Sequence, residues 1–296
     1  MAKIVELLKL MKQHGASDLH LVGGSPPYLR VQGEMVKLKY KAVSEEVCRA
    51  LIYELLSEGQ IEQFEENLEL DLSYALQGTG RFRVNVFMQR NGIGAVFRLI
   101  PEDILTIEEL SLPRQLYDLI DATEGLILVT GPTGSGKSTT LAALIHAINS
   151  TQKAHIITIE DPIEFVHHNQ KCLINQRELG SHTQSFSNAL RAALREDPDI
   201  ILVGEMRDLE TISLAITAAE TGHLVFATLH TNNAVKTIDR VVDVFPEGQQ
   251  SQIRVMLSES LRGVIAQTLV RRSDGQGRVP VVEVLLNTPA VANLIR

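Results

Sequence analysis

Eight consecutive residues, Gly131 to Ser138, have the types and the spacing that bind phosphate groups. Their sequence, GPTGSGKS, fills every fixed position of the pattern G-x-x-x-x-G-K-[ST]. Glycines in this pattern let backbone N–H groups turn inward around phosphate oxygens, and the next helix adds the partial positive charge of its N-terminus. The pattern assigns Lys137 to the β- and γ-phosphates and the Ser138 hydroxyl to Mg²⁺. The candidate nucleotide-binding residues are Gly131, Pro132, Thr133, Gly134, Ser135, Gly136, Lys137, Ser138 and Thr139.

The segments on both sides of these residues fit a phosphate loop. Residues 125–130 form a short apolar run with β-branched types, which predicts a buried strand, and residues 139–148 predict a helix. Strand, glycine loop and helix is the order that the motif requires. A glycine-rich turn that matches the pattern by chance is the alternative, and the flanking segments argue against it.

A predicted strand at residues 200–203 carries an acidic residue to the edge of the sheet where ligands of open α/β sheets bind. Gly204 and Glu205 follow this strand directly, as in a Walker B strand. Such a carboxylate holds Mg²⁺ directly or through water. We expect Glu205 and Ser138 to hold the metal; the alternative is that Glu205 is only a polar strand end.

A second acidic cluster follows the strand predicted at residues 155–159. It consists of Glu160, Asp161 and Glu164. Three carboxylates so close together would repel one another unless cations or hydrogen-bond donors lie nearby, which favours a role with Mg²⁺ and the attacking water. We expect Glu164, or else Glu160, to activate water. The alternative is a turn at Asp161-Pro162 with Glu164 on the surface.

Two histidines and two arginines are further candidates. His223 and His230 flank the strand predicted at residues 224–227, where an imidazole could donate to the γ-phosphate and signal its loss, or be part of the core. In the strand predicted at 80–90, alternation puts Arg81 and Arg83 on one face. These arginines either form a solvated polar face or contact phosphate.

The first 99 residues predict a compact α+β domain. Its helices are expected at 3–14, from an N-cap at Ser44 to about 57, and at 58–66, and its strands at 18–22, 28–31, 35–38, 70–76, 80–90 and 94–99. Residues 100–112, with Pro101, predict an interdomain linker that contains a short helical turn.

Residues 113–296 predict an α/β domain, because strands alternate with helices in the way that builds a parallel sheet covered on both faces. A helix is expected at 113–122. The core strands are expected at 126–130, 155–159, 200–203, 224–227 and 279–286.

Composition excludes several classes of protein. The net charge of −8 argues against non-specific nucleic-acid binding over the whole surface. Two cysteines, Cys48 and Cys172, are too few for a disulfide framework or a four-ligand zinc module and suit a reducing compartment. No apolar run approaches about 20 residues, so we expect no direct membrane insertion.

Four motifs, in this order and spacing, resemble the Walker A motif, Asp box, Walker B motif and His box of the ATPases of type II secretion, type IV pilus and type IV secretion systems. They are GPTGSGKS, ITIEDPIEF, IILVGEMRD and TGHLVFATLHTN. The segments GASDLHL, GRFRVN, AITAAETGH and KTIDRVVDVFP resemble more narrowly the PilT family, the type IV pilus retraction ATPases. The resemblance covers nearly the whole chain.

This resemblance implies a PAS-like N-terminal domain, a RecA-like ATPase domain and a homohexameric ring with ATP and Mg²⁺ bound between the two domains. It implies pilus retraction and twitching motility as the function, and a cytoplasmic protein held peripherally at the inner membrane by the inner-membrane pilus platform protein. Hydrolysis would close and open the joint at residues 100–112. The catalytic candidates are Lys137, Glu164, Glu205, Arg81, Arg83 and His230, and the further nucleotide contacts are Arg98, Glu160 and His223. Asp161 matches the Asp box as a third acid beside Glu160 and Glu164.

Two features bear on the direction of pilus movement. The long N-terminal extension and the four-cysteine module of extension and type II secretion relatives are not seen in this sequence, which favours retraction. The ending AVANLIR resembles the AIRNLIRE helix of the retraction family, with Ala292 where arginine is usual. The sequence stops inside that motif, so we expect a longer natural chain and a less secure coupling of hydrolysis to disassembly.

Two other functions remain open at this point. One is a type IV secretion ATPase that moves protein or DNA, because such proteins share the nucleotide site. The other is a nucleotide-binding assembly or regulatory subunit with negligible turnover, against which the carboxylates of Glu164 and Glu205 argue.

Overall fold

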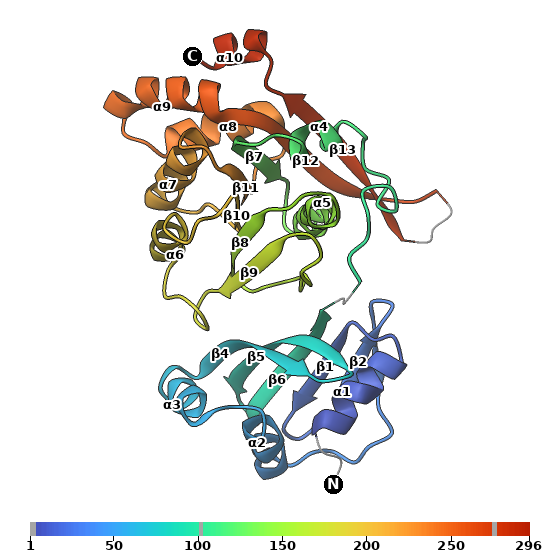
Figure 1. Cartoon of the computed structure of the whole chain (residues 1–296). Coiled ribbons are helices and arrows are strands. Elements are labelled where there is room, and N and C mark those ends of the chain that lie inside the picture. The colour runs from blue at the N-terminus through green and yellow to red at the C-terminus, as the bar shows by residue number, and fades with distance from the viewer. Residues whose placement is uncertain (1–3, 101–102, 274–276) are drawn as a thin grey trace. The chain divides into compact units, whose positions relative to one another are not determined.

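The computed structural model describes residues 4–100, 103–273 and 277–296, and the chain divides into two compact units, Met1–Glu102 and Asp103–Arg296. The division falls inside the segment at residues 100–112 that the sequence predicts to be a linker. Thr106 and Glu109 exchange backbone-to-side-chain hydrogen bonds there, and a short turn follows. Figure 1 labels the helices and strands of both units.

The N-terminal unit is an α+β structure with an antiparallel sheet of strand order β3-β2-β1-β6-β5-β4. Alternation in β5 sends Phe82 and Val84 into the core while Arg83 stays exposed. The helices are α1 (Ile4–Gln13), α2 (Glu45–Tyr53) and α3 (Glu58–Asn67). The strands are β1 (Asp18–Val22), β2 (Tyr28–Val31), β3 (Glu34–Lys37), β4 (Glu69–Leu76), β5 (Gly80–Gln89) and β6 (Gly92–Ile100).

The C-terminal unit is an α/β structure with a sheet of strand order β13-β12-β7-β11-β10-β8-β9. All neighbouring strands are parallel except β13, which runs antiparallel to β12. The strands are β7 (Gly125–Thr130), β8 (His155–Glu160), β9 (Leu173–Glu178), β10 (Ile200–Val203), β11 (Leu224–Leu229), β12 (Leu261–Arg271) and β13 (Arg278–Leu286). The helices are α4 (Leu116–Ile120), α5 (Lys137–Thr151), α6 (Phe186–Ala193), α7 (Leu209–Glu220), α8 (Ala234–Asp243), α9 (Glu247–Ser260) and α10 (Pro289–Ile295).

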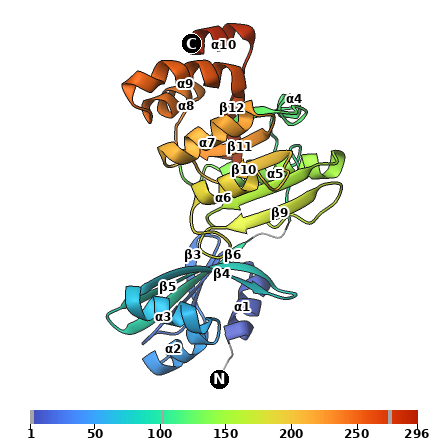
Figure 2. The same ribbon diagram turned by 60° about the vertical axis from the view of Figure 1, so that its left-hand side comes forward.

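Both faces of this second sheet are buried, because successive residues of its strands enter two different cores. In β7, Leu126 and Leu128 pack in the core on the side of α6 and α7, whereas Ile127 and Val129 pack in the core with α5. Figure 2 shows α6 and α7 turned toward the viewer in front of the strands. Burial on both faces explains why these strands are continuous apolar runs.

Helix boundaries in the first unit differ from the sequence prediction for a capping reason. The helix expected to reach residue 57 ends at Tyr53, because Ser57 caps the next helix. The Ser57 hydroxyl accepts from the Gln60 amide while the Gln60 side chain accepts from the Ser57 amide, a reciprocal capping box that fixes a new helix start. The strand expected at 35–38 is Glu34–Lys37, because Gln32 and Gly33 both take positive φ in a two-residue hairpin turn.

The second unit corrects three further expectations. The helix expected at 113–122 is only Leu116–Ile120, because tight turns precede it and no side chain caps it. Strands β9 and β12 were not predicted, and the strand expected at 279–286 is the antiparallel edge strand β13. Charged and polar residues interrupt the alternation in β9 and β12, so tertiary pairing rather than pattern decides their conformation.

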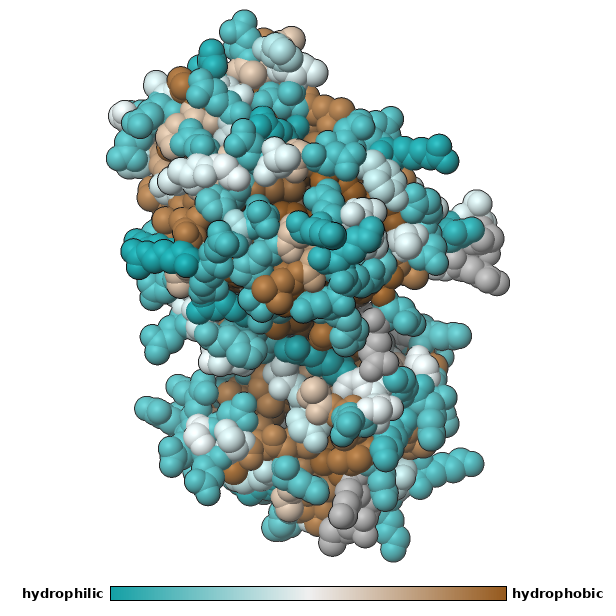
Figure 3. Space-filling view, viewed as in Figure 1, coloured by the Kyte–Doolittle hydropathy of each residue, from teal (hydrophilic) through white to brown (hydrophobic). Residues whose placement is uncertain are grey.

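Within the described ranges, the helices are too short or too polar for any of them to cross a bilayer. On the face drawn in Figure 3, hydrophilic side chains cover much of the surface, and hydrophobic residues show between them in groups.

Candidate nucleotide site

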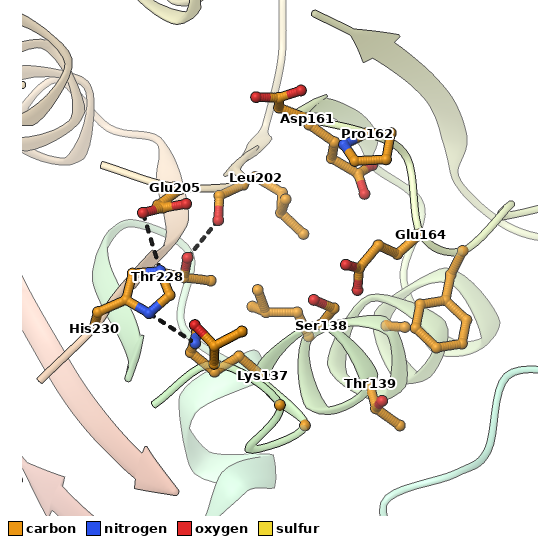
Figure 4. A pocket seen from close by; sticks show the side chains of 18 of the residues that line it. Lys137, Ser138, Thr139, Asp161, Pro162, Glu164, Leu202, Glu205, Thr228 and His230 are labelled. Carbon is orange, nitrogen blue, oxygen red and sulfur yellow. Dashed lines mark hydrogen bonds and ion pairs between the residues drawn. The ribbon is translucent and has the colours of Figure 1, made fainter. Parts of the chain in front are cut away.

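A pocket of about 420 Å³ opens at the carboxyl ends of the parallel strands of the C-terminal unit (Figure 4). This is the edge at which open α/β sheets bind ligands. Four chain segments converge there: the loop after β7, and the segments after β8, β10 and β11. Of the residues expected in the site, the pocket is lined by Thr133, Gly134, Gly136, Lys137, Ser138, Thr139, Glu160, Asp161, Glu164, Glu205 and His230. Gly131, Pro132 and Ser135 belong to the same loop behind this lining.

The loop after β7 takes a conformation that only glycine allows at two positions. Gly131 has φ 145°, and a Cβ there would lie 2.1 Å from the Gln267 carbonyl oxygen and 2.6 Å from Ser135 Oγ. Gly136, at the start of α5, has φ 88°. The hydroxyl of Ser135 is buried and has no hydrogen-bond partner among the described residues. The loop therefore has the cradle shape and the unsatisfied polar group expected of a phosphate-binding loop.

The ammonium group of Lys137 lies against the start of this loop. Its Nζ donates to the carbonyl oxygens of Gly131 at 2.8 Å and Pro132 at 3.2 Å. Burial lowers the pKa of the Lys137 ammonium, and the nearby carboxylates of Glu205 and Glu164 oppose that shift. Both carboxylates therefore lie close enough to act on this cation, and phosphate oxygens would replace the carbonyls as its partners.

Glu205 lies across the pocket from Glu164 in Figure 4. Its Oε2 accepts from Arg207 at 2.6 Å, and its Oε1 lies 3.0 Å from His230 Nε2. The hydrogen bond from Arg207 lowers the pKa of Glu205 most, followed by the charges of Arg207 and His230 against an opposing effect of burial. His230 Nδ1 in turn lies 3.5 Å from Lys137 Nζ. Glu205 is thus an ionised, fixed oxygen donor.

The acidic segment after β8 contains carboxylates in two different environments. Glu160 is half-buried at the end of β8, and its Oε1 accepts from the Thr158 hydroxyl at 2.6 Å and from Gln176 Nε2 at 3.1 Å. Burial raises the pKa of Glu160 in spite of these bonds. Glu164 is exposed in the pocket and points toward the start of α5, where Ser138 lies (Figure 4). Glu160 and Glu164 both line the pocket, but Glu164 is the more exposed of the two and is therefore the better placed to meet water.

The two histidines lie at opposite ends of β11. His230 follows the strand and lines the pocket, whereas His223 precedes it, which separates the two residues by roughly 20 Å along the strand. His223 Nδ1 is 3.0 Å from the Ala218 carbonyl oxygen, and its own carbonyl accepts from Gly125 at the start of β7. Of the two histidines, the structure brings only His230 into the described pocket. Any nucleotide contact of His223 stays a prediction from the resemblance.

The three candidate arginines belong to the N-terminal unit. Arg81 and Arg83 alternate with buried residues on β5, and Arg98 of β6 is the direct cross-strand partner of Arg83. All three therefore lie on one face of the antiparallel sheet. Arg98 Nε donates at 2.8 Å to Oδ1 of the buried Asp18, a structural ion pair that the sequence did not indicate. Contact of these arginines with phosphate stays a prediction.

Sequence reasoning missed three residues that support the pocket. Arg207, two positions after Glu205, was present in the quoted motif, and its spacing could have indicated the ion pair. The Thr228 hydroxyl donates to the Gly204 carbonyl oxygen and so fixes the end of β10 against β11. Gln267 of β12 contacts the phosphate loop, and no local signal pointed to it because its strand was not predicted.

His167, which lines this pocket, makes the stability of the protein depend on pH. Its Nδ1 is buried without a hydrogen-bond partner in the described part of the chain, and burial, with His146 and His168 nearby, lowers its pKa to about 4. The unfolded chain binds this proton at about pH 6.5, so stability from His167 is complete above about pH 6.5 and is lost as the pH falls toward about 4. Between about pH 7 and 4.5, the free energy of unfolding should fall by up to about 3 kcal/mol more in wild type than in His167→Gln. Chemical denaturation at both pH values measures this difference. Identical pH profiles of the two proteins would contradict this.

Fold and pocket together define a phosphate-loop nucleotide-binding protein of the α/β class. The family model described as "Type II/IV secretion system protein" matches residues 3–295, and the chain belongs to this family.

Similar proteins of this family have been described in bacteria. The chain is 57% identical to the type IV pilus retraction ATPase PilT of Pseudomonas aeruginosa, over 99% of this chain and 85% of that protein. It is 53% identical to a twitching motility protein of Neisseria gonorrhoeae, over 99% of this chain and 78% of that protein. The crystal structure of the pilus retraction motor PilT with bound ADP matches with a TM-score of 0.97 and 51% identity, and the match covers 100% of this chain and 86% of that one.

Proposed function

We propose that the chain is an ATP-hydrolysing motor subunit that powers type IV pilus retraction, and hence twitching motility. The observation that carries this proposal is the convergence of Lys137, Ser138, Glu164 and Glu205, from three segments, on one pocket at the carboxyl edge of the sheet. The similarity to a pilus retraction ATPase over 99% of the chain supports the direction of movement.

The residues of the pocket fit Mg²⁺ as well as nucleotide. The hydroxyl of Ser138 and the ionised carboxylate of Glu205 are the oxygen donors that Mg²⁺ prefers, and phosphate oxygens and waters complete such sites. This also explains why no cluster of three or more His, Cys, Asp and Glu side chains suited to a metal occurs among the described residues. When bound, the ion would neutralise charge on the phosphates.

Each of these side chains of the pocket has a separate role in ATP hydrolysis. Lys137 binds the β- and γ-phosphates and compensates the negative charge that spreads over the transferred group. Glu164 orients the attacking water and accepts its proton, because its side chain is exposed in the cavity while the Glu160 carboxylate is half-buried and already hydrogen-bonded to Thr158 and Gln176. His230, placed between Glu205 and Lys137, links the metal-binding side of the pocket to the phosphate-binding side.

The proposal also covers how the protein assembles and where in the cell it acts. We infer a homohexamer that acts at the cytoplasmic face of the inner membrane through the pilus platform protein. The division of the chain near residue 102 suits a two-domain motor with a joint at residues 100–112. The contacts of Arg81, Arg83 and Arg98 with phosphate belong to this proposal as well.

The proposal is tested by deleting the gene in its source organism and restoring it as wild type or as Lys137→Ala. We expect surplus surface pili and lost twitching in the deletion, rescue by wild type, and no rescue by Lys137→Ala. Cells without pili would instead indicate pilus extension, and normal piliation with normal twitching would contradict a motor of pilus retraction. Hydrolysis of ATP by the purified chain distinguishes a motor from a non-hydrolysing assembly subunit.

A further inference from the structure

Gln267 is a buried amide side chain that touches the phosphate loop from the neighbouring strand β12. Only 5% of its surface is exposed. Its Nε2 donates to the Ser135 carbonyl oxygen at 2.7 Å, and its Oε1 accepts from the Thr140 hydroxyl at 2.7 Å. One side chain thus bridges the loop and the first turn of the helix that follows it.

The direction of this amide is fixed by its partners. The carbonyl oxygen of Ser135 can only accept, so it must face the NH₂ group of Gln267 rather than its oxygen. The hydroxyl of Thr140 is then free to donate to Oε1, and Thr140 itself is buried. Turning the amide over would place two oxygens against each other and leave a buried carbonyl without a donor, which is costly.

The loop is also seated against Gln267 by close backbone contact. A Cβ at Gly131 would lie 2.1 Å from the Gln267 carbonyl oxygen, and one at Gly136 would lie 2.8 Å from Gln267 Nε2. Both ends of the glycine segment therefore rest on this one residue.

We propose that Gln267 is a positioning residue of the nucleotide site, which holds the phosphate loop in its binding conformation through Ser135 and Thr140. This inference rests on the proposed function, because it concerns the affinity of the same pocket for nucleotide. A loop held ready before binding loses less conformational entropy when the nucleotide arrives. Gln267 acts equally on ADP and on ATP, in the ground state and in the transition state.

The test uses the full chain with Gln267→Met, which keeps the size of the side chain and removes both hydrogen bonds. We expect the Kd for ADP, measured by calorimetry, to rise roughly tenfold to a hundredfold, because a buried carbonyl loses its donor. We expect KM for ATP to rise by a similar factor with kcat within about threefold of wild type, which is the pattern of a lost uniform binding interaction. A merely destabilised protein would show lowered kcat with unchanged KM, since only the active fraction falls.

Asn149→Leu is the matched control. Asn149 is a buried amide of α5, the helix that follows the phosphate loop. Its Oδ1 accepts from the Gln170 N–H at 3.0 Å, and its Nδ2 donates to the His168 carbonyl oxygen at 2.8 Å. It lies twelve residues after Lys137, about 18 Å along the helix axis. We expect a similar loss of thermal stability as in Gln267→Met but an unchanged Kd for ADP. An equal loss of ADP affinity in the control would overturn the proposal.

The ADP affinities of wild type and Gln267→Met also separate a failure of this inference from a failure of the proposed function. Unchanged ADP affinity in Gln267→Met, with wild type binding normally, contradicts only this inference and leaves the proposed function standing. A wild-type chain that does not bind ADP contradicts both. If Gln267→Met does not fold, Thr140→Val takes its place, because this change removes only the hydrogen bond from the Thr140 hydroxyl to Gln267 Oε1. We expect the Kd of Thr140→Val for ADP to rise at least threefold. An unchanged Kd would overturn the proposal.

Discussion

Lys137→Ala should abolish the ATPase activity of the chain, with a fall in kcat/KM of at least about a thousandfold in steady-state assays. Lys137 supplies the positive charge beside the phosphate loop, between the carboxylates of Glu205 and Glu164. Without it, the charge that spreads over the transferred phosphoryl group has no protein cation from this loop, and a thousandfold loss corresponds to about 4 kcal/mol of transition-state stabilisation. Folding should be preserved, because the Lys137 side chain is only partly buried and its two hydrogen-bond partners are carbonyls of the loop itself.

Lys153→Ala is the control for this change. Lys153 is an exposed lysine of the same unit, between α5 and β8. Removing it changes the net charge of the chain by the same amount, so activity should remain near that of wild type. Activity of Lys137→Ala within tenfold of wild type would refute the assignment of the pocket.

Glu205→Gln should lower kcat by roughly a hundredfold to a thousandfold while changing the Kd for ADP by less than about tenfold. The amide keeps the size of the side chain but lacks the negative charge that Arg207 and His230 hold in place. The metal donor that we propose at Glu205 is thereby weakened, and the charge of Arg207 loses its partner. Steady-state hydrolysis and calorimetry of the same preparations separate the effect on catalysis from that on binding.

Glu210→Gln provides the matched control for Glu205→Gln. Glu210 also forms an ion pair with an arginine, Arg191, but both side chains are about half exposed at the surface. Such pairs contribute about 0–1 kcal/mol to stability, so neither activity nor stability should change much. Hydrolysis by Glu205→Gln at the wild-type rate would show that this carboxylate has no catalytic part.

The amino-acid sequence alone determined the phosphate loop and the class of fold. Gly131–Ser138 is a contiguous motif whose conformation depends on local backbone freedom, and the apolar runs at β7, β8 and β10 mark strands that are buried on both faces. Residues 80–84 were likewise assigned their two faces correctly, because alternation along a strand is a local property. Local patterns are visible in a sequence because they involve neighbours in the chain.

Tertiary structure decided what each candidate residue faces. It bonded the Glu160 carboxylate to Gln176 of the unpredicted strand β9 and left Glu164 exposed in the pocket. It placed His223 at the far edge of the sheet from His230, and it paired Arg98 with Asp18. It also brought Gln267, 132 residues away in the chain, against Ser135. These outcomes depend on strand order and pairing between distant segments, which periodicity and motif spacing do not encode.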